Sequence, residues 1–294
     1  MPDFPSFESR TAILDDVRIH YLCGGQGPPL LLVHGLGSSA AVEFYYNLEA
    51  LAAHHQVLAV DLPGFGQSDK PPLEYTIDLF VRVLRDLMTS LKLERSAVMG
   101  VSMGGRVALG LALDTPGSVD RLILVDALGV GQPRPVLAYR LLLTKGLGEL
   151  ALSGTARALR QMDPRTIRRV WAWYLRRPGS VDTILSDDRI NNQSRLLSTP
   201  AYRTAYLSAL RSIVGTRSLR AGIVVADRPE GLARPTPPCR GRPTTIFPGR
   251  PSPPPGRRIK SCQVEIFDHS GHTPQMEEPE RFNRVVLAFL RSRD

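Results

Sequence analysis

Short apolar runs alternate with longer amphipathic segments along the first 130 residues of the chain. The short runs are bounded by Gly, Pro or polar residues, which is typical of buried strands, and they lie at residues 29–33, 56–60, 96–101 and 121–126. The longer segments repeat their apolar residues every three or four positions, which is typical of helices, and they lie at 43–53, 77–92 and 103–114. This alternation predicts an α/β fold, a mostly parallel sheet with helices on both faces.

The pattern differs at the two ends of the chain. Thr11 to Gly24 predicts two short strands with a hairpin turn near Asp15-Asp16. Near the other end, Val264–Phe267 predicts a strand, and a helix is expected from about Pro279 to Arg291.

Helical patterns alone follow the predicted strand at 121–126. They lie at residues 135–152, 166–176 and 201–213. We therefore predict a core of residues 1–128 and 218–294, with a helical cap inserted at 129–217. The aromatic residues Trp171, Trp173 and Tyr174 either line an apolar pocket of this cap or form its own core.

Composition narrows the class of protein. A chain of 294 residues with 43% hydrophobic residues suits one large domain with an insertion. The N-terminus lacks a basic region followed by an apolar run, and no stretch approaches the roughly 20 apolar residues of a membrane span. Cys23, Cys239 and Cys262 are too few and too widely spaced for a disulfide framework or a zinc site. We expect a cytoplasmic protein that needs no metal or organic cofactor.

The net charge of +9 is concentrated in the predicted cap. Val130–Arg220 holds 16 Lys and Arg against 5 Asp and Glu. This surplus can attract anionic substrates or a membrane surface, or it can simply solvate the helices of an arginine-rich protein. No nucleic-acid-binding motif accompanies the charge, so we expect a small-molecule substrate and no nucleic acid partner. The oligomeric state is left open.

The pentapeptide Gly100-Val101-Ser102-Met103-Gly104 lies between a predicted strand and a predicted helix. A serine at such a sharp turn has an exposed hydroxyl, and the flanking glycines avoid a clash between a Cβ and the neighbouring strand and helix. The helix N-terminus favours developing negative charge. The pattern is typical of a nucleophilic serine, and the alternative is an ordinary serine at a helix N-terminus.

Three further segments accompany this turn in a fixed order. They are Leu30–Gly37, a strand that ends in a glycine-rich turn, Val57–Ser68, a strand followed by a tight turn, and Val264–Gln275, a strand followed by a loop with two histidines. With the serine turn, they resemble the α/β-hydrolase superfamily over nearly the whole chain. The resemblance implies Ser102 as nucleophile, His272 as general base, and an oxyanion hole formed by the N–H groups of Leu36 and Met103.

The other histidines are interpreted as structural or solvated. His34 ends a strand and is expected to hold the oxyanion loop by hydrogen bonds, and His20 is expected to be structural. His54 and His55 follow an amphipathic helix and are expected to be solvated. His269 is too close to the end of its strand to compete with His272.

The triad acid is missing where the superfamily usually has it. Residues 228–260 hold ten prolines and a single carboxylate, Glu230, and Thr244 stands at the position of the usual acid. Since proline cannot donate to a central ladder, Pro237-Pro238-Cys239-Arg240 is expected not to form an interior strand. A threonine cannot act as the anionic partner of an imidazolium.

Three explanations remain open. One is a local frameshift in the coding DNA, which resequencing would test. Another is a different carboxylate, either Asp126 at the end of its strand or Asp227 after an apolar run, whereas Asp268 is too close in sequence to His272. The third is an impaired protein.

The resemblance implies a serine hydrolase that cleaves an ester or related acyl bond through an acyl-serine intermediate. The alternative is a carbon–carbon bond hydrolase of a ring-cleavage product, because Glu43–Leu48 loosely resembles those enzymes and a basic cap can hold a dienoate carboxylate. Epoxide hydrolases and haloalkane dehalogenases are disfavoured, since those relatives use an aspartate nucleophile. A binding protein that lost turnover with its acid is the rival of another class.

Overall fold

A computed structural model describes residues 4–129, 141–163, 165–167, 187–215, 219–220, 222–223, 238–241 and 265–292. Its strands are β1 (Phe7–Leu14), β2 (Val17–Gly24), β3 (Pro29–Val33), β4 (Gln56–Val60), β5 (Ser96–Val101), β6 (Val119–Val125), β7 (Pro238–Gly241) and β8 (Glu265–Phe267). Its helices are α1 (Ala40–Glu43), α2 (Leu48–Ala52), α3 (Ile77–Ser90), α4 (Met103–Asp114), α6 (Leu147–Gln161), α9 (Asp187–Ser198), α10 (Pro200–Ile213), α11 (Pro274–Glu277) and α12 (Pro279–Arg291).

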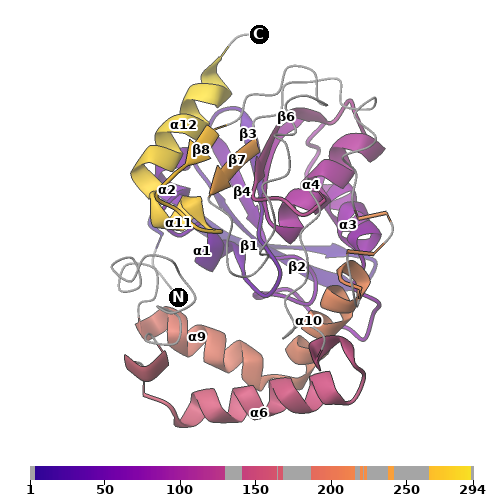
Figure 1. Cartoon of the computed structure of the whole chain (residues 1–294). Helices are drawn as coiled ribbons and strands as arrows, with labels where there is room; N and C mark the ends of the chain where they lie inside the picture. The colour runs from indigo at the N-terminus through magenta and orange to yellow at the C-terminus, as the bar shows by residue number, and fades with distance from the viewer. Residues whose placement is uncertain are drawn as a thin grey trace.

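The described strands form one sheet in the order β1-β2-β4-β3-β5-β6-β7-β8 (Figure 1). Strands β4, β3, β5, β6, β7 and β8 are parallel, whereas β2 is antiparallel to both β1 and β4. The predicted hairpin joins β1 to β2, and Asp15 and Asp16 have φ of 46° and 62° in its turn. Aspartate is one of the few residues other than glycine that adopts this conformation at low cost. The α/β prediction is confirmed.

The sheet is covered on both faces. In β3, Leu31 and Val33 pack in the cluster that includes α3, α4 and α10, whereas Leu30 and Leu32 pack in the cluster that includes α1, α2 and α12. All four side chains are fully buried. A strand that is buried on both faces has no polar alternation, which is why this run is continuously apolar in the sequence.

The prediction of a single helix at 43–53 was wrong. The structure has two short helices, α1 and α2, separated by residues 44–47. Phe44 and Asn47 in the break are fully buried, and the Asn47 side chain donates hydrogen bonds to the carbonyl of Gln275 and to Asn283 Oδ1. Tertiary contacts of this kind override the helical periodicity.

The expectation about residues 237–240 was also wrong. Strand β7 lies inside the sheet, with Leu124 opposite Pro238 on one side and Cys239 opposite Glu265 on the other. Pro238 is the first residue of the strand, which is where a missing N–H group costs the ladder least. The sheet therefore continues through β7 to β8, the strand that leads to His272.

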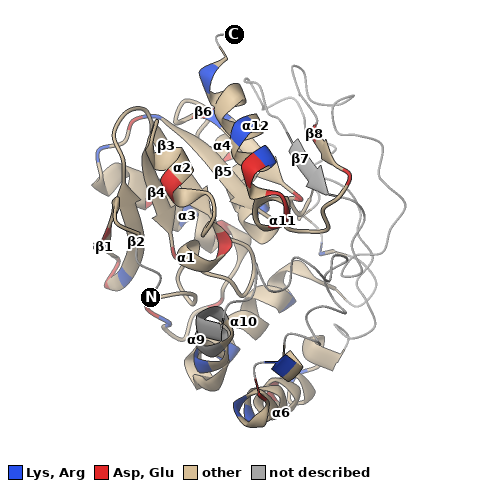
Figure 2. Cartoon of the chain, turned by 90° about the vertical axis from the view of Figure 1, so that its left-hand side faces the viewer, with Lys and Arg blue, Asp and Glu red and all other residues tan. Residues whose placement is uncertain are grey.

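Helices α6, α9 and α10 pack on one another and form a layer beyond the carboxyl ends of the strands (Figure 1). Figure 2 shows Lys and Arg on α6 and α9 of this layer. The helix expected at 201–213 is α10. The helix expected at 135–152 is interrupted within the described residues: residues 141–143 are helical, 144–146 form a turn, and α6 begins at Leu147 and ends at Gln161. Trp171, Trp173 and Tyr174 lie outside the described residues, and the boundaries of the cap stay a prediction.

Across the described ranges, none of the helices combines the length and the hydropathy needed to cross a membrane.

Candidate active site

Ser102 lies in the turn between β5 and α4 in a strained backbone conformation. Its φ is 53° and its ψ is −114°, a region that residues with a Cβ rarely adopt. Three backbone hydrogen bonds fix it there. Its N–H donates to Val125 O at 2.9 Å, and its carbonyl accepts from Leu128 N at 3.0 Å and from Arg106 N at 3.2 Å. Two of these bonds tie Ser102 to the end of β6 and to the segment that follows it.

The two glycines of the turn are required by close packing. A Cβ on Gly100 would overlap the carbonyl group of Gly104, and a Cβ on Gly104 would overlap the carbonyl of Val33 in β3. The Gly-x-Ser-x-Gly spacing therefore lets α4 sit directly against the sheet, with Met103 as its first residue. The steric reason expected for these glycines is confirmed.

The loop after β3 lies beside Ser102. A Cβ on Gly35 would be 3.4 Å from the Cβ of Ser102. The fully buried His34 braces this loop, since its Nδ1 donates to Gly35 O at 2.7 Å and its Nε2 accepts from Leu62 N at 3.1 Å. The expected structural role of His34 is confirmed. The roles of Leu36 and Met103 as oxyanion donors stay predictions.

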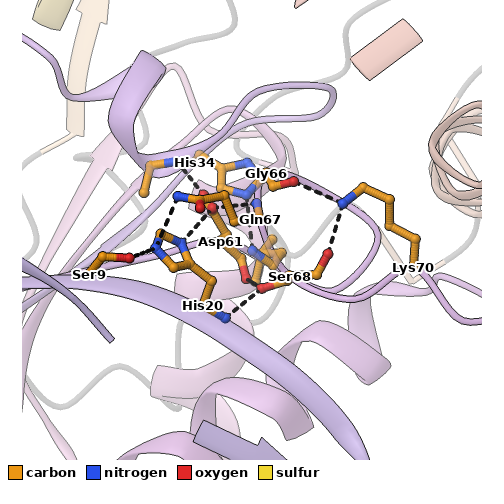
Figure 3. Close-up of polar contacts among 10 residues, drawn as sticks. Ser9, His20, His34, Asp61, Gly66, Gln67, Ser68 and Lys70 are labelled. Atoms are coloured by element: carbon orange, nitrogen blue, oxygen red, sulfur yellow. Dashed lines mark hydrogen bonds and ion pairs between the residues drawn. The ribbon is translucent and has the colours of Figure 1, made fainter. Parts of the chain in front are cut away.

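A buried network around Asp61 supports the same loop (Figure 3). Asp61 Oδ1 accepts from Ala40 N at 2.7 Å, and Oδ2 accepts from Gln67 N and from His20 Nδ1, each at 2.8 Å. Burial raises the pKa of Asp61, but the hydrogen bond from His20 and the other donors outweigh burial, so this pKa lies below its usual value. Asp61 is thus an anion that joins β2, β4 and the start of α1.

The outer part of this network closes the turn after Asp61. Ser68 Oγ donates to Asp61 O at 2.6 Å, and Lys70 Nζ donates to the carbonyls of Gly66 and Ser68, both at 2.8 Å. His20 N donates to Ser68 Oγ at 2.8 Å. The expected structural role of His20 is therefore confirmed.

The loop between β8 and α11 carries His272, and a buried carboxylate organises it. Glu277 accepts hydrogen bonds from Gly271 N at 3.0 Å, from Thr273 N at 3.1 Å and from the Thr273 hydroxyl at 3.0 Å. These donors flank His272 on both sides in the sequence. Glu277 therefore fixes the backbone on either side of the imidazole.

Asp126 follows β6 with a φ of 41°, and its Oδ2 lies 3.4 Å from His272 Nδ1. The two side chains are 15% and 19% exposed. Burial lowers the pKa of His272, but the hydrogen bond and the charge of Asp126, followed by the charges of Glu43 and Glu277, outweigh burial and raise this pKa above its ordinary value. Of the two carboxylates that the sequence leaves open, the structure brings Asp126 to His272.

The remaining sequence candidates lie elsewhere or beyond description. Asp227 and Thr244 are outside the described residues, as is most of the segment 228–260, so the frameshift explanation stays a hypothesis. Asp268 and His269 are exposed. Within the described part of the chain, no group of three or more His, Cys, Asp or Glu residues could hold a metal ion.

One expectation about the histidines is corrected. His54 is exposed as expected, but His55 is only 6% exposed and its Nδ1 has no hydrogen-bond partner. Burial lowers the pKa of His55. The helix before it is shorter than the sequence indicates, so the chain turns back into the core one residue after His54.

Sequence reasoning also missed Glu43 and Glu277. Both are buried near His272, at 6% and 7% exposure. A carboxylate in a helical segment is usually solvated, so neither stands out in the sequence. The available signal for Glu277 was its position five residues after His272, within reach of the backbone of the same loop.

Comparison with known proteins agrees with this architecture. The family model described as the alpha/beta hydrolase fold matches residues 28–279. The chain therefore belongs to the α/β-hydrolase family.

Among its relatives is an uncharacterised protein of Mycobacterium tuberculosis, 30% identical over 97% of this chain and 81% of the relative. Another is the 2-hydroxy-6-oxo-6-(2'-aminophenyl)hexa-2,4-dienoic acid hydrolase of Metapseudomonas resinovorans, 26% identical over 94% of this chain and 89% of that enzyme. The solved structure of the 2-hydroxy-6-oxo-6-phenylhexa-2,4-dienoate hydrolase from Rhodococcus sp. strain RHA1 covers 97% of this chain and 98% of its own, with 22% identity and a TM-score of 0.78. At that identity the structure shows the fold alone.

Proposed function

We propose that this chain is a serine hydrolase with Ser102 as nucleophile, His272 as general base and Asp126 as the acid that orients the imidazole. The observation that carries the proposal is the approach of Asp126 Oδ2 to His272 Nδ1 at 3.4 Å. Asp126 directly follows β6, and β6 is paired with β5, the strand that Ser102 directly follows. A carboxylate on Nδ1 orients the imidazole so that its other ring nitrogen can take the proton of a serine hydroxyl.

The proposed reaction has two halves. In the first, Ser102 Oγ attacks a carbonyl carbon while His272 takes the hydroxyl proton, and the backbone N–H groups of Leu36 and Met103 stabilise the oxyanion. His272 then gives its proton to the leaving group, and an acyl-serine remains. In the second half, His272 takes a proton from water, the water oxygen attacks the acyl carbon, and Ser102 regains its proton as the acid leaves.

For the substrate class we favour a ring-cleavage product whose carbon–carbon bond next to a keto group is hydrolysed. The support comes from a relative named as a hydrolase of a substituted hexa-2,4-dienoic acid, which aligns over 94% of this chain. In this case the leaving group is a dienoate carbon, and the proton from His272 ends on that carbon.

An ester or related acyl bond is the second candidate. Three carboxylates among the described residues, those of Asp126, Glu43 and Glu277, act on His272. Arg106, one turn after Ser102, donates instead to the carbonyls of Gly222 and Ile223. These three negative charges beside the proposed base favour an uncharged acyl substrate over an anionic dienoate.

Two chromogenic substrates separate the candidates. 2-Hydroxy-6-oxo-6-phenylhexa-2,4-dienoate loses its yellow colour when its carbon–carbon bond is cleaved, and p-nitrophenyl butyrate releases nitrophenolate when its ester is cleaved. Turnover of the dienoate that is lost in Ser102→Ala supports the first candidate, and turnover of the ester alone supports the second. A folded protein that is stabilised by either compound without turning it over would contradict both, and would indicate a binding protein.

A further inference from the structure

Glu43 is a buried carboxylate to which the proposed reaction gives no part. It is the last residue of α1, and its side chain accepts two hydrogen bonds. Gly35 N donates to Oε2 at 3.3 Å, and Gln275 Nε2 donates to Oε1 at 2.7 Å. Burying a carboxylate is costly unless it is well paired, so a glutamate that is 6% exposed at this position needs a reason.

The carboxylate lies close to the nucleophile. A Cβ placed on Gly35 would be 3.4 Å from the Ser102 Cβ and 3.5 Å from Glu43 Oε2. Glu43 and Ser102 therefore flank the same point of the loop after β3, and Glu43 holds the N–H group that precedes the predicted oxyanion donor Leu36.

The second hydrogen bond reaches the segment that carries the base. Gln275 is fully buried in α11, three residues after His272, and its own carbonyl accepts a hydrogen bond from Asn47. Helices α1 and α11 lie side by side in both views of the molecule (Figures 1 and 2). Glu43 thus joins the loop beside the nucleophile to the helix that follows the base.

Three carboxylates act on the His272 imidazole from different elements. Asp126 acts from the end of β6, Glu43 from α1, and Glu277 from α11. The charge of Glu43 ranks after that of Asp126 and ahead of that of Glu277 in raising the pKa of His272.

We propose that Glu43 is a positioning residue with two effects: it fixes the oxyanion loop against the histidine segment, and its negative charge stabilises the imidazolium that His272 forms when Ser102 loses its proton. The catalytic role of Glu43 rests on the proposed function. The effect of its charge on His272 is a property of the free protein, so it can be measured without a substrate.

Three variants separate the effect of the Glu43 charge from the effect of its two hydrogen bonds. Glu43→Gln removes the charge but keeps an acceptor for Gly35 N, and the Gln275 amide can rotate because its Oε1 has no partner in the structure. Glu43→Asp keeps the charge on a shorter side chain that cannot reach both donors. Glu280→Gln, an exposed glutamate on α12, is the matched control for loss of one negative charge.

The test is an NMR titration of the His272 imidazole in each protein, with the signal assigned by its loss in a His272→Asn variant. We expect the pKa of His272 to fall by about one unit in Glu43→Gln and to stay unchanged in Glu280→Gln. In Glu43→Asp the pKa stays close to that of the wild-type protein, whereas the turnover number falls.

A His272 titration in Glu43→Gln that superimposes on that of the wild-type protein would overturn the proposal and leave Glu43 a structural residue. The same holds if Glu43→Asp turns over as fast as the wild type. Failure of the proposed function is separate, because it would remove turnover from all the proteins and leave the NMR titrations as they are.

Discussion

Backbone groups hold Ser102, whereas side-chain carboxylates hold the loop that carries His272. At Ser102 the strained turn is fixed by hydrogen bonds with Val125, Leu128 and Arg106, all between main-chain atoms. At His272 the neighbouring N–H groups donate to Glu277, and the imidazole pairs with Asp126.

The difference separates geometry from electrostatics. Substitutions in the serine turn disturb packing, because the sheet and α4 are in direct contact there. Substitutions around His272 change the local charge, and therefore the pH range in which the imidazole is neutral. The two halves of the site are therefore expected to respond to substitution in different measurements.

The largest effect is expected from Asp126→Asn. Asparagine also tolerates positive φ, so the backbone after β6 is kept, but an amide cannot act as the anionic partner of His272. We expect kcat to fall by about 10⁴-fold with little change in thermal stability. Asp268→Asn, at the exposed first residue of the loop that carries His272, is the control and is expected to retain activity. Activity lost in Asp268→Asn and kept in Asp126→Asn would refute the assignment.

Gly100→Ala tests the packing of the serine turn. Since the new Cβ overlaps the carbonyl group of Gly104, we expect a loss of about 3 kcal/mol in the free energy of unfolding, measured in urea. Gly117→Ala is the matched control, because nothing lies within 4 Å of a Cβ there. Equal unfolding midpoints for the two variants would contradict the packing argument.

Glu277→Gln tests the histidine loop. In glutamine an NH2 group replaces one carboxylate oxygen, and it cannot accept the hydrogen bond from Gly271 N or from Thr273 N. The imidazole of His272 is therefore held less precisely. We expect kcat to fall by about 10- to 100-fold with KM nearly unchanged. A rise in KM at constant kcat would instead assign Glu277 to substrate binding.

The pH profile gives the smallest and most specific effect. His272 must be neutral to accept the Ser102 proton, and its pKa is raised, so kcat/KM is expected to rise with pH and to level off above a midpoint higher than about 6.5. Loss of a negative partner lowers the pKa, so the midpoint in Asp126→Asn should move to lower pH. A midpoint that moves to higher pH would reverse the sign and contradict the electrostatic account.

Periodic elements could be predicted from the sequence because each is marked by a local pattern of residues. Strand β3 follows from an apolar run, the β1–β2 hairpin from two aspartates that tolerate positive φ, and the turn at Ser102 from flanking glycines that permit close packing. The exceptions depend on distant contacts. Strand β7 forms between β6 and β8 although it begins with a proline, and the break before α2 is fixed by Asn47 and its partners in α11 and α12.

The candidate site, like the fold, could be predicted only where its residues stand in a local pattern. Ser102 and His272 stand in recognisable local patterns, so they could be named as candidates. Asp126 could only be kept as one of two carboxylates, because its approach to His272 depends on the order of the strands. Glu43 and Glu277 had no local signature, since burial decides their importance and burial is a property of the fold.

A fluorophosphonate probe, which labels an activated serine without the need for a known substrate, gives the most direct test of the proposed triad. The rate of labelling is followed by intact mass in the wild-type protein, Ser102→Ala, Asp126→Asn and Asp268→Asn. The account predicts one label per chain in the wild type, none in Ser102→Ala, a rate reduced by several orders of magnitude in Asp126→Asn and an unchanged rate in Asp268→Asn. Labelling of Asp126→Asn at the wild-type rate would contradict it.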